Sequence, residues 1–234
     1  MTTPGRAGSA PDDRQPAMVG RRPRADADET RLQLLRAAER LFAERGIEAV
    51  SLRDIHQAAG QRNTSAVNYH FGGKEGLIRA IIEARADVTN ARRMQLLAQA
   101  EASGRGEDAR SLVDALVWPL AEEIRQGTYY VGFLSRLIVE RDLDRPVRYA
   151  ADPVWSSAVV VGRRLRSLLA HVDRSVFDLR FRLAFDLVVH ALATEQAAGR
   201  RGGPDRLLPL DAYVTHLADA VTGLLSAPGS AADA

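Results

Sequence analysis

One short stretch of the sequence, residues 61–74, gathers side-chain types that recognise nucleic acid. An asparagine can form two hydrogen bonds with adenine, an arginine can do the same with guanine, and hydroxyl groups reach phosphate oxygens. Projected at 100° per residue, a helix over residues 64–71 separates an apolar side from a polar side. The apolar side holds Val67 and Phe71, and the polar side holds Ser65, Asn68 and Tyr69, joined by Gln61 and Arg62 if the helix begins early.

Lys74, the single lysine of the chain, opens the next expected helix. The first N–H groups of a helix have no partner inside it and form the positive end of its dipole. A phosphate at this place would meet both an ammonium group and free N–H donors. We therefore expect a phosphate contact here, while an ordinary helical hairpin with a polar outer face is the alternative.

Three helices are expected to position this stretch. Ser51, with Asp54 three residues later, forms a variant of the capping box, and Gly46 and Gly60 are placed to end helices. Two short helices joined by a glycine turn form a helix-turn-helix, whose second helix enters the major groove. The expected helices cover residues 28–45, 52–59 and 64–71.

The same residues resemble the DNA-binding domain of TetR-family repressors over about residues 30–82. The resemblance is carried by the run SLRDIHQAAG from Ser51 and the run NTSAVNYHFGGKEGLIRAI from Asn63. The stretch before His70 is one residue longer than in the commonest form of the motif, so the residue that caps the helix is left open among Arg62, Asn63 and Thr64. The resemblance implies phosphate contacts by Tyr69, His70 and Lys74, and positions at or near base edges for Arg62, Asn63, Thr64, Ser65 and Asn68.

Beyond this region, apolar residues recur at helical spacing, and no stretch alternates with a period of two over a convincing strand length. We expect an all-α fold with an N-terminal three-helix helix-turn-helix DNA-binding domain and a larger helical ligand-binding and dimerisation domain. A bridging helix over 74–100 should bury Leu77, Ile81, Ala84 and Val88, followed by helices near 107–126, 128–142, 153–171, 175–198 and 210–226. The expected division is a disordered arm over 1–25, the DNA-binding domain over 26–73, the second domain over 74–226 and a disordered tail over 227–234.

The second domain is expected to hold an effector pocket, which the resemblance also implies. A pocket between helices needs apolar walls and a few polar anchors. On the helix near 128–142, Arg136 sits at the polar edge of an aromatic face, so the effector should be hydrophobic with a carboxylate, phenolate or carbonyl that Arg136 bonds. Pairing of Arg136 with Glu140 and no ligand contact is the alternative. The candidate ligand-binding residues are Trp118, Tyr130, Phe133, Arg136, Trp155 and Phe185.

The last two long helices are the expected homodimer interface, because small residues allow close helix packing. On the first of them Asp178, Arg182, Asp186 and His190 form a charged ladder, either a surface row or a partly buried stripe at an interface or pocket wall. The basic cluster Arg21, Arg22 and Arg24 either lies along DNA or is a solvated tail. The small residues expected at the homodimer interface are Ala191, Ala193, Ala218, Ala220 and Gly223, with Leu224 beside them.

Other functional classes lack their signals. The five histidines show no metal-ligand spacing, there are no cysteines, and no phosphate loop or nucleophile motif appears, so we expect no metal, cofactor or catalytic activity. No apolar run approaches the roughly 20 residues that cross a bilayer, and the first residues lack the core of a signal peptide. The sequence predicts a cytoplasmic repressor released from a palindromic DNA operator by a small effector. The alternative is a dimeric DNA-binding protein whose second domain serves dimerisation or a protein partner.

Overall fold

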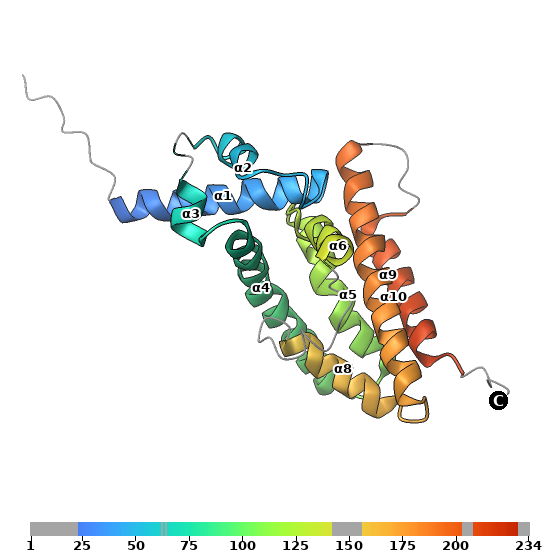
Figure 1. Ribbon diagram of the computed structural model, residues 1–234. Helices are drawn as coiled ribbons and strands as arrows, with labels where there is room; N and C mark the ends of the chain where they lie inside the picture. The colour runs from blue at the N-terminus through green and yellow to red at the C-terminus, as the bar shows by residue number, and fades with distance from the viewer. Residues whose placement is uncertain (1–22, 62, 64, 142–155, 203–207, 229–234) are drawn as a thin grey trace, which may run out of the picture.

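The computed structural model describes residues 23–61, 63, 65–141, 156–202 and 208–228. These residues form helices and turns and contain no strand, which confirms the expected all-α fold class. A small N-terminal group of helices stands on a larger helical body (Figure 1). The helices are α1 (Pro23–Arg45), α2 (Leu52–Ala58), α3 (Ala66–Phe71), α4 (Lys74–Ala102), α5 (Ala109–Arg125), α6 (Tyr130–Arg141), α8 (Ser156–Leu168), α9 (Arg174–Arg201) and α10 (Leu210–Ser226).

The N-terminal helices follow the expected order, with one difference at their start. Helix α1 begins at Pro23 rather than Asp28, because proline has a φ angle preset for a first helical turn, where its missing N–H is not needed. The expected disordered arm lies almost entirely outside the described residues, as do Arg21 and Arg22. At the other end of α1, Gly46 takes a φ of +92° and its N–H donates to the Phe42 carbonyl at 3.0 Å.

Helix α4 joins the two parts of the molecule, running from α3 into the larger body (Figure 1). Its expected inner stripe is half wrong. Leu77 and Ile81 are buried, but Ala84 and Val88 are exposed. The buried face instead recurs every three to four residues, and it includes two polar residues, Thr89 and Arg93, whose side chains form hydrogen bonds. It continues through Ala86, Thr89, Arg93, Leu97 and Ala100.

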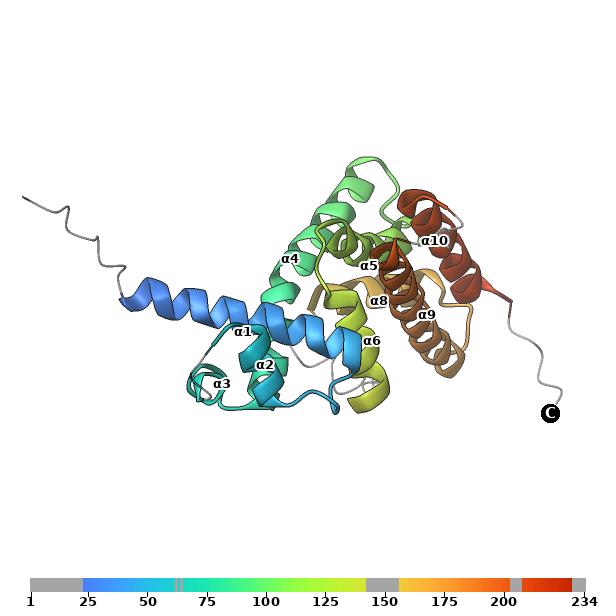
Figure 2. The ribbon, with the colours of Figure 1, turned by 90° about the horizontal axis from the view of Figure 1, so that it is seen from above.

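The larger body surrounds α6. Helix α6 packs between α1 and α9, while α4 packs on α5 and α8, and α10 packs on α5 and α9. Figure 2 shows the C-terminal end of α1 against α6, with α9 and α10 beyond it. Among the described residues, no helix is long and apolar enough to cross a membrane. The N-terminal helices are in direct contact with the larger body through α1 and α4.

Candidate DNA-binding surface and effector cavity

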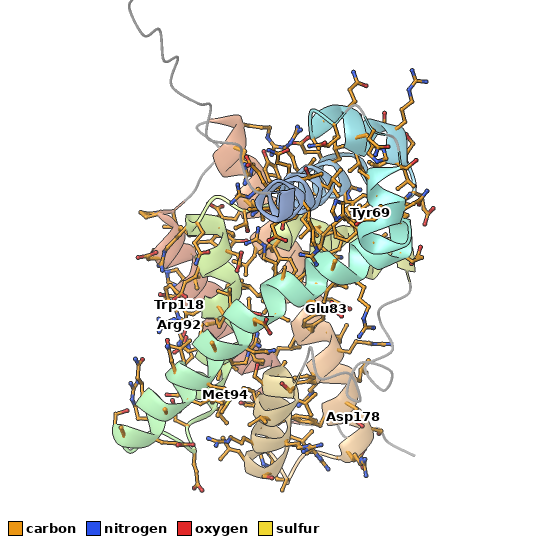
Figure 3. All side chains as sticks on the ribbon, turned by 90° about the vertical axis from the view of Figure 1, so that its left-hand side faces the viewer. Tyr69, Glu83, Arg92, Met94, Trp118 and Asp178 are labelled. Atoms are coloured by element: carbon orange, nitrogen blue, oxygen red, sulfur yellow. The ribbon has the colours of Figure 1, made fainter. Side chains whose placement is uncertain are left out.

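Helix α3 presents a polar side to solvent and an apolar side to the core. Val67 is fully buried, whereas Asn68 and Ser65 are exposed and Tyr69 is 83% exposed. His70 is half-buried, and its ring meets the Tyr69 ring edge-on at 5.0 Å between centroids. Figure 3 shows Tyr69 where α3 meets the start of α4, with Glu83, Arg92 and Met94 following along α4. The exposed residues are available to a partner, as a groove-reading helix requires.

A buried histidine positions α3. His56 of α2 is 2% exposed, and its Nε2 accepts a hydrogen bond from the Val67 N–H of α3 at 3.2 Å. Gln61, in the turn between the two helices, donates to the Gln33 side chain of α1 at 2.8 Å. Sequence reasoning weighed His56 only as a metal ligand and missed this role. The available signal was its place beside buried Ile55, directly before the glycine turn.

A capping box fixes the start of α2, and a side-chain turn precedes α3. Ser51 and Asp54 complete the capping box, in which Asp54 N–H donates to Ser51 Oγ at 3.2 Å and Ser51 N–H donates to the Asp54 carboxylate at 2.9 Å. The hydrogen bonds from Ser51 hold the pKa of Asp54 below its usual value. Before α3, Asn63 Oδ1 accepts the Ser65 N–H at 2.9 Å. The N-cap of α3 is Ser65, so none of the three expected residues holds the cap position; Asn63 stabilises the turn before it, and Arg62 and Thr64 lie outside the described residues.

The junction of α3 and α4 depends on Gly76, which no sequence pattern singled out. A Cβ on Gly76 would lie 1.7 Å from the Phe71 carbonyl oxygen, so a larger residue there requires the backbone to move. Gly72 and Gly73 turn the chain between the helices with φ angles of +71° and +119°. Lys74 then opens α4, half-buried, with its Nζ 5.9 Å from the centroid of the Phe42 ring. The orientation of α3 relative to α4 is thus set by close backbone contact.

Comparison with known proteins fits this geometry. The family model described as bacterial regulatory proteins, tetR family, matches residues 34–81, which include α2, α3 and the start of α4. The chain therefore carries a segment similar to the N-terminal domain of TetR-family regulators. The relatives that match this segment are named as a transcriptional regulator and a transcriptional repressor.

Individual relatives match the same part of the chain. The regulator TtgR of Pseudomonas putida is 40% identical over 63 residues, which are 27% of this chain and 30% of TtgR. The repressor KstR2 of Rhodococcus jostii is 35% identical over 94 residues, 40% of this chain and 43% of KstR2. The chain thus spans less than half the length of these TetR-type relatives. A crystal structure of a HlyIIR mutant protein covers 86% of this chain and all of its own, at 15% identity and a TM-score of 0.50, and supports the fold alone.

The larger body holds a small, mostly apolar cavity of about 60 Å³ between α4, α5, α6, α8, α9 and α10. Of the expected ligand-binding residues, Tyr130 and Phe185 line it. Phe133 is buried against Phe42 of α1, with ring centroids 6.1 Å apart, and Trp155 lies outside the described residues. Trp118 is half-buried, and its Nε1 donates to Asp114 at 3.0 Å. The structure therefore brings two of the six candidates together at the cavity.

The expected anchor Arg136 does not reach this cavity. Its side chain is exposed, because α6 turns Tyr130 and Leu134, four residues apart, toward the cavity and the position of Arg136 toward solvent. The expected alternative partner, Glu140, instead accepts the Glu48 N–H at 2.9 Å. The cation at the cavity is Arg93 of α4, which the helical projection of a single segment could not identify.

A cluster of charged groups links α1, α4 and α5. Arg85 of α4 donates to the buried Glu39 of α1 at 2.9 Å and lies 3.6 Å from the buried Glu123 of α5. Glu39 also accepts the Tyr129 N–H at 2.7 Å, just before α6. Burial raises the pKa of Glu123, and the nearby guanidinium of Arg85 opposes that rise. These contacts join the DNA-binding helices to the helices that line the cavity.

The surface of α9 and α10 differs in detail from the expected dimer face. Ala218 is fully buried inside the protomer, so it cannot contact a second chain, whereas Ala220 and Gly223 are exposed. On α9 the exposed large apolar residues are leucines spaced four apart, which are not among the residues predicted for the interface. They are Leu179, Leu183 and Leu187, at 47%, 44% and 40% exposure.

The charged ladder of α9 divides between two environments. Asp178 is exposed and lies 3.9 Å from Arg174, whereas half-buried His190 contacts Ser135 of α6 at 3.2 Å through Nδ1. The first part of the ladder therefore follows the surface, and its last residue packs inside the protomer. Among the described residues, no group of histidines and carboxylates is placed to hold a metal ion.

Proposed function

We propose that the chain is a transcriptional repressor that binds a palindromic DNA operator as a homodimer. The observation that carries this proposal is α3, a short helix held by buried contacts from α2 that exposes Asn68 and Tyr69. Asn68 and Ser65, with Arg62, Asn63 and Thr64 nearby in sequence, would read or approach base edges. Tyr69, His70 and Lys74 would contact phosphates. KstR2, a matched relative, is named as a repressor.

A homodimer would place two α3 helices about one DNA turn apart, roughly 34–36 Å. The exposed leucines of α9, with Ala220 and Gly223 of α10, supply an apolar surface for pairing two protomers. In this proposal the DNA-binding domain covers residues 26–73 and the effector and dimerisation domain covers 74–226. The repressor would act in the cytoplasm.

A small effector would release the repressor from DNA through α4. This helix begins beside α3 and reaches the cavity, so a ligand that displaces its cavity end would tilt its DNA end. The effect cannot exceed the ligand's preference for the released state. The Arg85 contacts to Glu39 and Glu123 would change with the same movement.

A second candidate is a DNA-binding dimer without a small effector. The small cavity favours it, because about 60 Å³ is far below the roughly 300–1,000 Å³ of common ligand sites. A thermal-shift screen of apolar and aromatic compounds separates the two candidates. A saturable stabilisation supports the effector, and its absence across the screen supports the second candidate.

Selection from a pool of random duplex DNA tests operator binding. We expect the full chain to enrich a two-fold symmetric sequence whose half-sites lie about 10 base pairs apart, or a multiple of that spacing. An Asn68→Ala protein that remains folded should fail to enrich the same sequence. Enrichment of no motif by the wild-type chain would contradict the proposal.

A further inference from the structure

The cavity combines apolar walls with one buried cation. Arg93 of α4 is 6% exposed and lies on the cavity wall. It stands between Arg92 and Met94, which Figure 3 labels on the middle part of α4. The apolar walls are formed by Leu116, Leu120, Leu134, Phe181, Phe185 and Val188. A cation in such surroundings is costly unless its hydrogen bonds and charge are satisfied.

Part of the Arg93 guanidinium has a structural explanation. Its Nε donates to the Ala115 carbonyl of α5 at 3.0 Å. That carbonyl lacks its usual helical donor, because the residue four positions later is Pro119, which has no N–H. Nη1 donates to Ser157 Oγ of α8 at 2.8 Å and more weakly to Asn90 Oδ1 at 3.4 Å. The guanidinium is therefore held in one orientation by neutral partners on α4, α5 and α8.

The remaining nitrogen of Arg93 and the hydroxyl of Tyr130 have no such explanation. Among the described residues, neither Nη2 nor the Tyr130 hydroxyl makes a hydrogen bond, and no carboxylate pairs with Arg93. Both side chains are buried, with Arg93 6% and Tyr130 1% exposed. Both residues line the cavity.

The protonation of both groups makes them donors. Burial lowers the pKa of Arg93 to about 10, which leaves the guanidinium charged at neutral pH. Burial also raises the pKa of Tyr130, which keeps its hydroxyl protonated. The cavity wall thus carries a cationic donor and a neutral donor, and no carboxylate is among the described residues that line it.

We propose that Arg93 and Tyr130 anchor the carboxylate of a small effector whose remaining part is apolar. A planar carboxylate matches the guanidinium fork and accepts the phenol as a further donor. This inference rests on the proposed effector function and specifies the chemistry of its ligand. Because the cavity of about 60 Å³ holds only a few water molecules, the effector must widen it. A carboxylate that competes with Ser157 for Nη1 would loosen α8 from α4, so the cavity would widen between these two helices.

Direct binding to the full chain tests the anchor without DNA. The probes are octanoate and phenylacetate, each paired with its primary amide, which keeps the shape and removes the charge. Isothermal titration should show that at least one acid binds about tenfold or more tightly than its amide, as loss of a charge-assisted hydrogen bond predicts. The Tyr130→Phe protein should bind that acid severalfold more weakly. Arg136→Gln, a change outside the cavity, is the matched control and should leave acid binding unchanged.

The role of Arg93 needs a background in which its structural bond is dispensable. Pro119→Ala supplies an N–H to the Ala115 carbonyl, so Arg93→Met in that background removes the cation without leaving this carbonyl unpaired. Circular dichroism and urea unfolding check that both proteins are folded. We expect the Pro119→Ala protein to bind the acid and the double variant to lose at least tenfold in affinity.

Three outcomes overturn the anchor. They are acids that bind no better than their amides, acid binding that survives the double variant, and no binding of either acid at millimolar concentration. Each leaves repression by DNA binding standing, because operator selection is measured separately. Conversely, acid binding that depends on Arg93 but leaves operator affinity unchanged would support the anchor and contradict release from DNA.

Discussion

Helix α4 carries one cation at its first residue and another within the larger body, in opposite surroundings. Lys74 opens the helix at the DNA-binding end, half-buried beside the Phe42 ring. Arg93 is held inside the larger body by α5 and α8. Salt and water weaken a charge at the surface, whereas a buried charge acts through short-range bonds in a low dielectric. In our proposal one helix therefore carries both a phosphate contact that does not depend on the DNA sequence and a buried contact that selects the ligand.

The largest effect is expected where the DNA end of α4 meets α3. Gly76→Ala places a Cβ against the Phe71 carbonyl oxygen, at 1.7 Å in the present geometry. Such overpacking should cost about 3 kcal/mol of stability, measured by urea unfolding, and should weaken operator binding as α3 moves. Stabilisation by about 1 kcal/mol, the response of an unconstrained helical glycine, would show that this contact does not fix α3.

A smaller effect is expected from the reading face of α3. Asn68 is exposed, so Asn68→Ala should not change the fold. It should cost about 1–3 kcal/mol on the selected operator, measured by fluorescence anisotropy, with little loss on random DNA. Equal losses on both DNAs would make Asn68 a backbone contact.

Lys74→Ala should weaken binding to all duplexes severalfold and alike. Loss of one phosphate contact lowers the slope of log affinity against log salt by about one unit. Anisotropy titrations at several salt concentrations on operator and random DNA measure this slope. An unchanged slope would mean that the Lys74 ammonium contacts the Phe42 ring and no phosphate, which would contradict its proposed role in DNA binding.

The smallest effect is expected at Glu123 of α5, which lies beside Arg85 in the part of α4 between Lys74 and Arg93. Burial raises its pKa above that of the unfolded chain, near 4.5, so the folded state loses stability as pH rises through the folded pKa. Glu123→Gln removes this loss and keeps a hydrogen-bond acceptor for Thr128. As the pH rises above about 4.5, the variant should therefore lose less stability than the wild type in urea unfolding. A larger loss in the variant would mean that the ionised Glu123–Arg85 pair is net stabilising.

The same comparison explains what could be predicted from the sequence. The DNA end follows from local signals, since the Ser51 and Asp54 capping box, Gly46 and the polar side of α3 each depend on a few neighbouring residues. The close contact at Gly76 was missed because it depends on the angle between two helices, which no local pattern specifies.

The cavity end depends on contacts between distant segments. Helix α6 packs against both α1 and α9, so its face alone could not show that Tyr130 lines the cavity while Phe133 meets Phe42. Arg93 is buried partly because Pro119, on another helix, leaves a carbonyl in need of a donor. An apolar stripe inferred from one helix contains no charged residue, so it could not include Arg93.

Operator affinity of a cavity-filling variant tests the link between the two ends most directly. Ala184 of α9 is buried on the cavity wall and lies on none of the DNA-binding helices, so Ala184→Leu fills the cavity without a ligand. Ala98→Leu, on the exposed side of α4, is the matched control. We predict that Ala184→Leu weakens binding to the selected operator about fivefold or more, as a coupling free energy of about 1 kcal/mol requires, while Ala98→Leu binds like the wild type. A folded Ala184→Leu protein with wild-type operator affinity would contradict the account.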